Sequence, residues 1–373
     1  MVLETSTLPT ELYPCVHFCN AQYYIIVLSK LQVFFQKNIK FFQKELSFFA
    51  NAREMQKSLA QSARLCYNKI TILTPEGALM KLFAPAYYKH FRCIADACEH
   101  SCCIGWEIDI DDTTLQKYKQ LKTGYGATIC DSIEWEETPH FRLCEGDRCP
   151  HLDERGLCKI ILGAGEDHLC DICREHPRFY NFTSVAEVGV GMSCPEAARL
   201  VLSSPDFFSM EEVGEVDAEP DGVLFDGRAE RVKIYNVLQK KDYAAALAQI
   251  YSAYSVDVGD DAEWLKILGS LEYLNADHRE LLLHYTSKNR PKGERIEDYC
   301  KRFLAYFIYR HCTEAIDEED FCARLTFCLF CERLFASLLC FKGAETLQEV
   351  ATLASILSEE IEYSDDNTWA LMG

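Results

Sequence analysis

The chain has 373 residues, of which 49% are hydrophobic and 12% aromatic, and its formal net charge at pH 7 is −20. This much apolar and aromatic content builds large cores, which excludes an intrinsically disordered protein. The negative charge excludes the basic footprint that phosphate binding requires, so we expect no nucleic-acid partner. No segment has the length and clean flanks of a membrane span, so we expect no stable membrane insertion.

Residues 1–79 differ in composition from the rest of the chain. Pairs of phenylalanines recur every seven residues, at 34–35, 41–42 and 48–49, and lysines occupy positions between them. This pattern predicts an amphipathic helix with one aromatic face that docks on the body, with a basic membrane-surface helix as the alternative. We interpret residues 1–79 as an N-terminal amphipathic extension. In a second interpretation Met80 is the true start and this segment lies upstream of it.

Residues 80–204 form a cysteine-rich region that holds 11 of the 20 cysteines. Gly and Pro interrupt it so often that only short strands and helices fit. Alternation of apolar and polar residues from Trp106 to Asp111 predicts a short, half-buried strand, and Asp111 or Asp112 is expected to cap a helix that begins near Thr113. Eight cysteines form the candidate metal site: Cys93, Cys98, Cys102, Cys103, Cys149, Cys158, Cys173 and Cys194.

Thiols at this density form either a disulfide framework or a metal site. Disulfide scaffolds are mostly small secreted domains that lack a sufficient core, and this chain has apolar residues enough for large cores, so metal is favoured. Soft sulfur ligands select zinc or an iron–sulfur cluster. The spacing leaves both open, although only Cys170-x2-Cys173 has the form of a zinc knuckle and clusters tolerate the wider spacing seen here.

The neighbouring pair Cys102-Cys103 bears on the number of metal sites. Adjacent side chains of an extended backbone point to opposite sides, so the two thiols would serve two separate metals, or one would ligate while the other packs. Because the region is too irregular for a continuous apolar core, bound metal is expected to supply part of its folding energy.

Residues 205–228 are rich in Asp and Glu and contain Gly and Pro, which predicts a solvated, mobile acidic linker. Residues 229–373 are predicted to form a C-terminal helical bundle. Apolar residues recur at helical spacing over 296–308 and 347–361, residues 321–341 are apolar nearly all round, and a helix over 232–254 is expected to break near Asp242. Cys328 and Cys331 are expected to pack in the core rather than chelate. The predicted fold class is therefore mainly α, with an irregular metal-stabilised cysteine-rich region containing short strands, followed by a helical bundle.

Several sequence blocks carry a family resemblance. They are Pro85-Ala86-Tyr87-Tyr88-Lys89, Phe91-Arg92-Cys93-Ile94, Cys102-Cys103 with Gly105-Trp106, Cys149-Pro150-His151-Leu152 with Gly156-Leu157-Cys158, Cys173-Arg174 with Pro177-Arg178, Ser193-Cys194-Pro195-Glu196-Ala197-Ala198-Arg199, and Tyr306-x3-Arg310. From about Met80 to near the C-terminus, the chain resembles the flagellin lysine-N-methylase family. The first blocks also resemble a broader group of zinc- or iron-chelating cysteine-cluster proteins.

The resemblance implies a cytoplasmic enzyme of the bacterial flagellum that transfers methyl groups from S-adenosylmethionine to lysine side chains of flagellin. It also implies a 4Fe-4S cluster, with zinc as the alternative metal. Cys170 departs from the family pattern, in which the cysteine directly before Arg174 is the regular one, so we leave it outside the principal ligand set. A non-catalytic zinc- or iron-binding cysteine-cluster protein is the alternative function.

The resemblance leaves the catalytic residues unassigned. Arg174 and Arg178, which follow the candidate ligand Cys173, are candidates for contacting the carboxylate of S-adenosylmethionine, because guanidinium groups match carboxylates bidentately. In the alternative interpretation the two arginines brace the fold by pairing with acidic neighbours.

Overall fold

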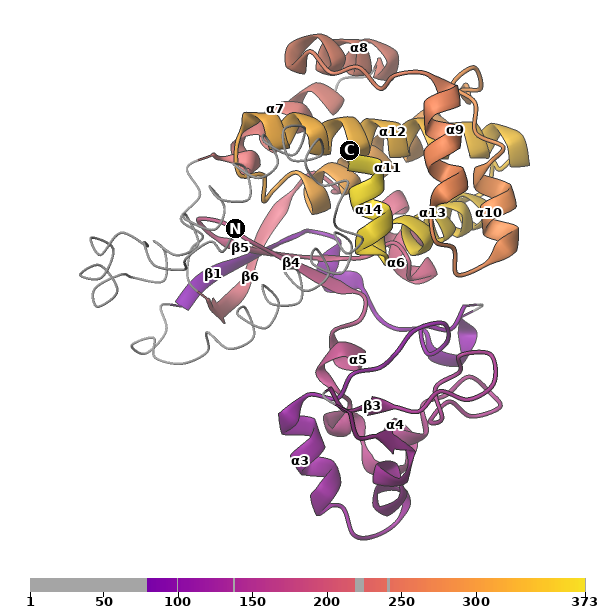
Figure 1. Cartoon of the computed structure of the whole chain (residues 1–373). Helices are drawn as coiled ribbons and strands as arrows, with labels where there is room; N and C mark the ends of the chain where they lie inside the picture. Colours follow the sequence, from indigo (N-terminus) through magenta and orange to yellow (C-terminus); the bar gives the residue numbers. More distant parts are fainter. Residues whose placement is uncertain (1–78, 99, 137, 219–224, 240–241, 373) are drawn as a thin grey trace, which may run out of the picture. The chain divides into compact units, whose positions relative to one another are not determined.

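A computed structural model describes residues 79–372 apart from positions 99, 137, 219–224 and 240–241. The chain divides into two compact units, residues 1–77 and 78–373. Residues 1–78 of the predicted extension lie outside the described residues. The second unit is mainly helical with short strands, as the sequence predicts (Figure 1). None of its described helices is both long and apolar enough to span a bilayer.

Four strands form a mixed sheet in the order β4-β5-β1-β6. Their bounds are β1 Leu79–Pro85, β4 Arg178–Phe182, β5 Ala186–Val190 and β6 Met210–Asp217. β1 is parallel to β5, whereas the pairs β1–β6 and β4–β5 are antiparallel. Every residue of β5 is buried, so both faces of this inner strand are covered.

The strand β6 corrects the prediction of a mobile acidic linker over 205–228. β6 pairs with β1 over its whole length, and most of its side chains are exposed. Two of its glutamates form ion pairs with lysines: Lys81 pairs with Glu212 and Lys89 with Glu211, each at 2.8 Å. Charged side chains on an edge strand prevent pairing with another chain. The acidic composition therefore reflects an exposed sheet edge over these eight residues.

The helices of the C-terminal part form the predicted bundle (Figure 1). Including the helix that precedes β6, they are α6 Pro195–Ser203, α7 Gly227–Leu238, α8 Tyr243–Tyr254, α9 Asp261–Ser270, α10 Ala276–Leu282, α11 Glu294–His311, α12 Glu318–Lys342, α13 Leu347–Glu362 and α14 Asp365–Met372. α12 is buried along most of its length and packs against α11 and α13. The predicted break near Asp242 is confirmed, since the Asp242 side chain accepts a hydrogen bond from the Ala245 N–H and caps α8.

The cysteine-rich region between β1 and β4 consists of short elements. They are η2 Tyr88–His90, η3 Ala95–Ala97, α3 Asp112–Gln120, η4 Tyr125–Ser132, β2 Ile133–Glu134, β3 His140–Phe141, α4 Lys159–Ala164, η5 Glu166–His168 and α5 Asp171–Glu175. The segment predicted as a strand is extended and hydrogen-bonds along β3, with Ile108 and Ile110 buried. Asp111 caps α3 as predicted, accepting from the Thr114 N–H at 2.8 Å.

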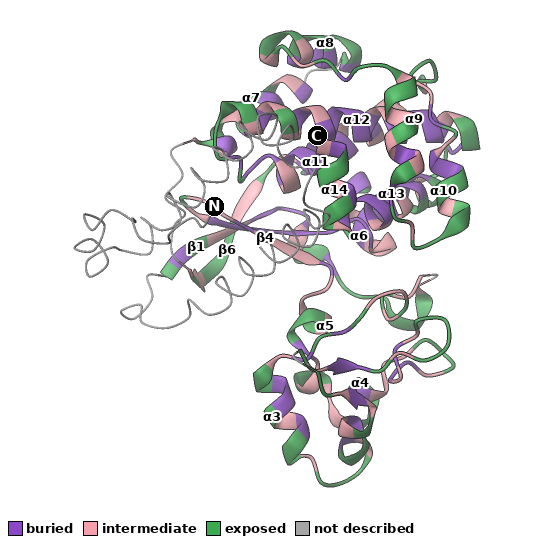
Figure 2. Ribbon diagram, in the orientation of Figure 1, coloured by how far each residue is buried: buried purple, intermediate pink, exposed green. Residues whose placement is uncertain are grey.

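The described residues form two hydrophobic cores, and the limit between these cores does not fall at the predicted domain boundary of 204/205. A small core of Ile108, Ile110, Leu115, Tyr118, Ile129, Phe141 and Ile160 lies within the cysteine-rich region. Tyr87, Phe91, Val190 and Ala197 belong instead to the large core of the bundle. The two ends of the predicted cysteine-rich domain therefore pack with the helices of the bundle. These ends hold α6 and the residues that flank the strands, and Figure 2 shows the buried positions of the bundle and of the cysteine-rich region.

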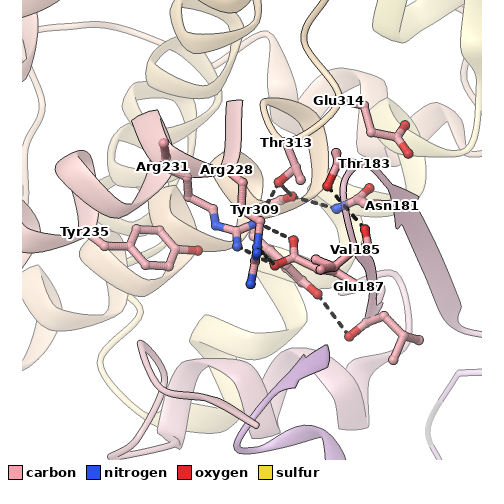
Figure 3. A network of polar contacts seen from close by, with 12 residues as sticks. Asn181, Thr183, Val185, Glu187, Arg228, Arg231, Tyr235, Tyr309, Thr313 and Glu314 are labelled. Carbon is pink, nitrogen blue, oxygen red and sulfur yellow. Dashed lines mark hydrogen bonds and ion pairs between the residues drawn. The ribbon is translucent and has the colours of Figure 1, made fainter. Parts of the chain in front are cut away.

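A buried ion pair joins the sheet to the bundle (Figure 3). The Arg231 guanidinium on α7 donates two hydrogen bonds, at 2.6 and 2.7 Å, to the carboxylate of Glu187 on β5, and both side chains are almost completely buried. Arg228 donates to the same carboxylate at 2.8 Å, and Thr313 accepts from Arg231 at 2.7 Å. The pairing satisfies a carboxylate that would otherwise be costly inside an all-buried strand.

Candidate functional site

The eight candidate ligands lie in two groups. The first, the outer thiol group, consists of Cys93, Cys98, Cys102 and Cys194. Burial raises the pKa of Cys98, and the electrostatic effects of Cys102 and Cys93 raise it further. Burial, together with Cys98 and Cys102, raises the pKa of Cys194 to about 11. Cys98 therefore lies within electrostatic range of the other three thiols, although the four sequence positions span a hundred residues.

The second group, the core thiol group, consists of Cys103, Cys149, Cys158 and Cys173, together with Cys170. All five side chains belong to the small hydrophobic core of the cysteine-rich region or pack against it. Burial raises the pKa of Cys149 to about 11, with Cys158 and Cys170 acting in the same direction. A soft donor set enclosed by apolar side chains is the environment of thiolate-bound zinc and iron–sulfur clusters.

Cys102 and Cys103 lie at the junction of the two groups. A hydrogen bond between their thiols lowers the pKa of Cys102 to about 7 and raises that of Cys103. Cys98 and Cys194 are electrostatic neighbours of Cys102, whereas Cys149 and Cys158 are neighbours of Cys103. The two adjacent thiols thus have different further neighbours, but they also interact with each other, because residues 102 and 103 lie in a turn and not in the extended backbone that would point them to opposite sides.

Cys170, which the family pattern left outside the ligand set, is fully embedded in the core thiol group. Its side chain is 1% exposed, its Sγ lies 3.4 Å from the Tyr118 hydroxyl oxygen, and its thiol interacts with that of Cys173. The signal was present in the sequence as the Cys170-x2-Cys173 spacing. The geometry thus adds a fifth thiol to this group.

The donor chemistry of both groups fits a soft metal. Every described cysteine is a free thiol, so none of these side chains is committed to a disulfide. Among the described residues, no three His, Cys, Asp or Glu side chains are arranged so as to hold a metal ion.

A groove of about 460 Å³ adjoins the outer thiol group. Its lining residues come from the 95–105 loop, the 155–156 turn, the loop before α10, α10 itself and α13: Ala95, Asp96, Cys98, His100, Ser101, Ile104, Gly105, Arg155, Gly156, Leu274, Asn275, His278 and Glu359. A larger groove of about 590 Å³ lies beside α11 and is lined by Gln239, Tyr243, Glu294, Arg295, Glu297, Asp298 and Lys301. Only the smaller groove combines a thiol, two imidazoles and carboxylates, so we regard it as the candidate functional site.

Two consecutive glutamates of α13 have different environments at this groove. The carboxylate of Glu360 already has three hydrogen-bonding partners. It accepts from the backbone N–H groups of Leu274 and Asn275 and lies 2.7 Å from His278 Nδ1. Glu359 Oε1 lies 3.5 Å from His100 Nε2, and its side chain is 18% exposed. Burial raises the pKa of Glu359, with Glu360 adding to the effect and His100 and His278 opposing it. Sequence patterns gave no sign of either glutamate.

The two arginine candidates lie outside the groove lining. Arg174 on α5 forms an ion pair with Asp171, three residues earlier on the same helix, and its Nε lies 3.8 Å from Glu175. Arg178 on β4 donates to the Tyr88 hydroxyl at 2.9 Å and lies over the rings of Tyr88 and Phe91. Arg174 thus pairs with acidic neighbours, as the interpretation that the arginines brace the fold expects, whereas Arg178 packs on aromatic side chains.

The blocks around Cys194 and Tyr306-x3-Arg310, far apart in sequence, meet in the structure. The Tyr306 hydroxyl accepts from the Met192 N–H at 3.1 Å and from Arg310 at 3.0 Å. Glu362, fully buried on α13, pairs with Arg310 at 3.2 Å and with His311. Gly191 lies so close that an added Cβ would be 2.8 Å from the Arg310 Nη1. This packing fixes the backbone that leads into Cys194.

The fold and the site define a mainly helical protein with two groups of thiols, one of which adjoins a polar groove. No family model matches the chain, and no solved structure matches it. Among curated proteins, it is 32% identical over 139 residues to the flagellar biosynthetic protein FliU of Salmonella muenchen, which covers 34% of this chain and 80% of FliU. It is 30% identical over 139 residues to the lysine-N-methylases of Salmonella choleraesuis and Salmonella typhimurium.

These similarities show that the chain belongs to the flagellin lysine-N-methylase family. The match spans only 34% of the length of either lysine-N-methylase.

Proposed function

We propose that the chain transfers methyl groups from S-adenosylmethionine to lysine side chains of flagellin. The observation that carries this proposal is the similarity to relatives named lysine-N-methylase and flagellar biosynthetic protein. The groove supports it chemically, since a methyl acceptor needs a recess that combines apolar wall with acceptors for an ammonium group. Because free thiols persist in reducing compartments, we propose a cytoplasmic location.

We further propose that the thiols hold a soft metal, as a 4Fe-4S cluster or as zinc. The core thiol group, Cys103, Cys149, Cys158 and Cys173 with Cys170, would supply one ligand set, and the outer thiol group would supply another. The bound metal would provide folding energy to a region whose own core is small. The chain's remaining task is to bind the lysine and the methyl donor and to deliver a neutral amine, because a protonated amine has no lone pair to attack the methyl carbon.

A non-catalytic zinc- or iron-binding protein is the second candidate function. The gathering of nine thiols, all free, in two groups favours metal binding whether or not catalysis follows. The two candidates differ in whether flagellin and S-adenosylmethionine react.

One experiment separates them. The full chain is purified without oxygen, its iron and zinc are measured, and it is incubated with flagellin and labelled S-adenosylmethionine before mass spectrometry of flagellin lysines. Methylated lysines support the transferase. Stoichiometric metal without methylation supports the metal-binding protein, and the absence of both contradicts each.

A further inference from the structure

We propose that Glu359, in the groove beside the outer thiol group, receives the ammonium group of the substrate lysine and takes up its proton. This inference rests on the proposed function and adds the general base that neither the sequence nor the relatives supply. In this proposal the groove binds the substrate lysine.

Glu360 and Glu359 have different roles at the groove. Glu360 is completely buried, and three donors hold it: the Leu274 and Asn275 N–H groups and the His278 ring. These bonds fix the loop before α10 as one wall of the groove. Glu359, the residue directly before Glu360 on α13, lines the groove itself. Its distance of 3.5 Å to His100 is longer than a good hydrogen bond, so its carboxylate has capacity for a further donor.

The groove suits a lysine side chain in both of its parts. Ile104 and Leu274, which are 38% and 58% exposed, offer apolar surface to a four-carbon stem. The carboxylates of Asp96 and Glu359 offer acceptors to the ammonium group. A lysine that enters along the apolar walls therefore meets Glu359 with its charged end.

The charged and titratable groups that face Glu359 come from every neighbouring element. They are Asp96, Cys98 and His100 on the 95–105 loop, Arg155 on the adjoining turn, His278 on α10 and Glu360 on α13. Burial and Glu360 raise the pKa of Glu359 above its ordinary value, which makes its carboxylate a stronger base. A cationic substrate would be attracted to the same carboxylate.

The proposed step conserves atoms and charge. A proton passes from the lysine ammonium to a Glu359 oxygen, leaving a neutral amine and a neutral carboxyl group. The amine lone pair then forms the nitrogen–carbon bond to the methyl group of S-adenosylmethionine, and the carbon–sulfur bond electrons stay on sulfur as S-adenosylhomocysteine leaves. The methylated amine carries the positive charge, and the proton on Glu359 passes to water.

Glu359→Gln tests the step, because it removes the base and nearly preserves the shape. At about pH 7 we expect methyl transfer to fall at least about 100-fold, the contribution of a positioned general base. The rate of the variant should then rise about tenfold per pH unit, because solution supplies more neutral amine below the ordinary lysine pKa of about 10.4. Glu280→Gln, an exposed site on α10 outside the groove lining, removes the same charge and should keep the wild-type rate and pH profile.

Metal content and thermal unfolding are measured on each variant, so that a folding defect is recognised. If Glu359→Gln fails to fold, Glu359→Ala takes its place, because it also removes the carboxylate. A wild-type rate and pH profile in that variant overturns the inference, while a reduced rate with the steeper profile supports it. A folded Glu359→Gln variant with a rate within twofold of wild type overturns the role of Glu359 alone. A wild-type protein that never methylates flagellin overturns the proposed function instead.

Discussion

At the scale of single residues, buried charges hold the described unit together. Glu187 pairs with Arg231 between the sheet and α7, and Glu362 pairs with Arg310 and His311 between α13 and α11. Each carboxylate is completely buried, yet each has enough donors to remain ionised. Removing one member of such a pair leaves an uncompensated charge inside the protein, which costs far more than the intact pair contributes.

We predict that Arg231→Met lowers the free energy of unfolding by about 3 kcal/mol, the lower end of the cost of breaking a buried pair. The lower end applies because Arg228 still donates to Glu187. Urea unfolding followed by circular dichroism measures the change. As a control, Lys233→Ala removes an exposed partner of Glu230 and should cost less than about 1 kcal/mol. Equal losses in both variants would contradict a special role for the buried pair.

The same carboxylates predict how stability depends on pH. Burial alone would raise the pKa of Glu187 and of Glu362, but Arg231 and Arg228 in the first case, and Arg310 and His311 in the second, lower it below the ordinary value of 4.5. A carboxyl whose pKa is lower in the folded state stabilises the fold fully above that ordinary value, and the contribution is lost as pH falls through the folded value.

We therefore expect the urea midpoint to be constant between about pH 7 and about pH 5.5 as far as these two groups are concerned, and to fall below about pH 4.5. In Glu187→Gln the midpoint at neutral pH should be lower and its further drop in acid smaller, because the group no longer titrates. A drop in acid as large as that of the wild type would show that Glu187 is not a source of the acid lability.

At the scale of elements, α12 and the core thiol group use cysteine differently. Cys328 and Cys331 are fully buried within α12, and burial raises the pKa of both thiols far above the ordinary value. A neutral buried thiol behaves as a small hydrophobic side chain. The cysteines of the core thiol group lie instead among other thiols in the small core.

This contrast predicts opposite outcomes for the same substitution. Cys331→Ser should lower stability by about 1–3 kcal/mol, since it buries a hydroxyl in an apolar core, and should leave metal content unchanged. Cys149→Ser should lose most of the bound metal. Elemental analysis of anaerobically purified variants, paired with thermal unfolding, measures both effects. Metal lost from Cys331→Ser and kept by Cys149→Ser would reverse the assignment.

The strand β6 gives a second prediction at this scale. If residues 210–217 pair with β1 as described, their inward-facing amides exchange slowly with deuterium. Hydrogen exchange by mass spectrometry should find protection in a peptide over 210–217 and little in a peptide over the loop 287–293. Replacing Leu82 of β1 with Pro removes an amide from the central strand and should abolish that protection. Rapid exchange of 210–217 in the wild type would restore the mobile-linker interpretation.

At the scale of the whole molecule, the division at residues 77/78 predicts that the second unit folds by itself. A chain that begins at Ala78 keeps all of β1 and both described cores. We expect it to stay soluble, to bind the same metal and to unfold at the temperature of the full chain. Calorimetry of the two chains side by side measures this. Aggregation of the shorter chain would indicate that the phenylalanine pairs of the first 50 residues cover apolar surface on the body.

Local signals in the sequence determined much of the helical architecture. Periodic apolar residues gave α11, α12 and α13, and the capping aspartates Asp111 and Asp242 gave the starts of α3 and α8, because a helix and its cap depend on residues only a few positions apart. The clustering of soft ligands gave the candidate thiols by the same reasoning. The blocks around Cys194 and Tyr306 pointed to the family that the relatives support.

Only the tertiary structure decided which distant residues become neighbours. It paired acidic β6 with β1, assigned Cys102 and Cys103 to different thiol groups, and brought Glu359 to the loop that carries Cys98 and His100. Composition described the 210–217 segment as a linker because charge is equally compatible with a solvated coil and with an exposed edge strand. Strand pairing and groove formation depend on contacts across more than a hundred residues, and neither periodicity nor spacing carries that information.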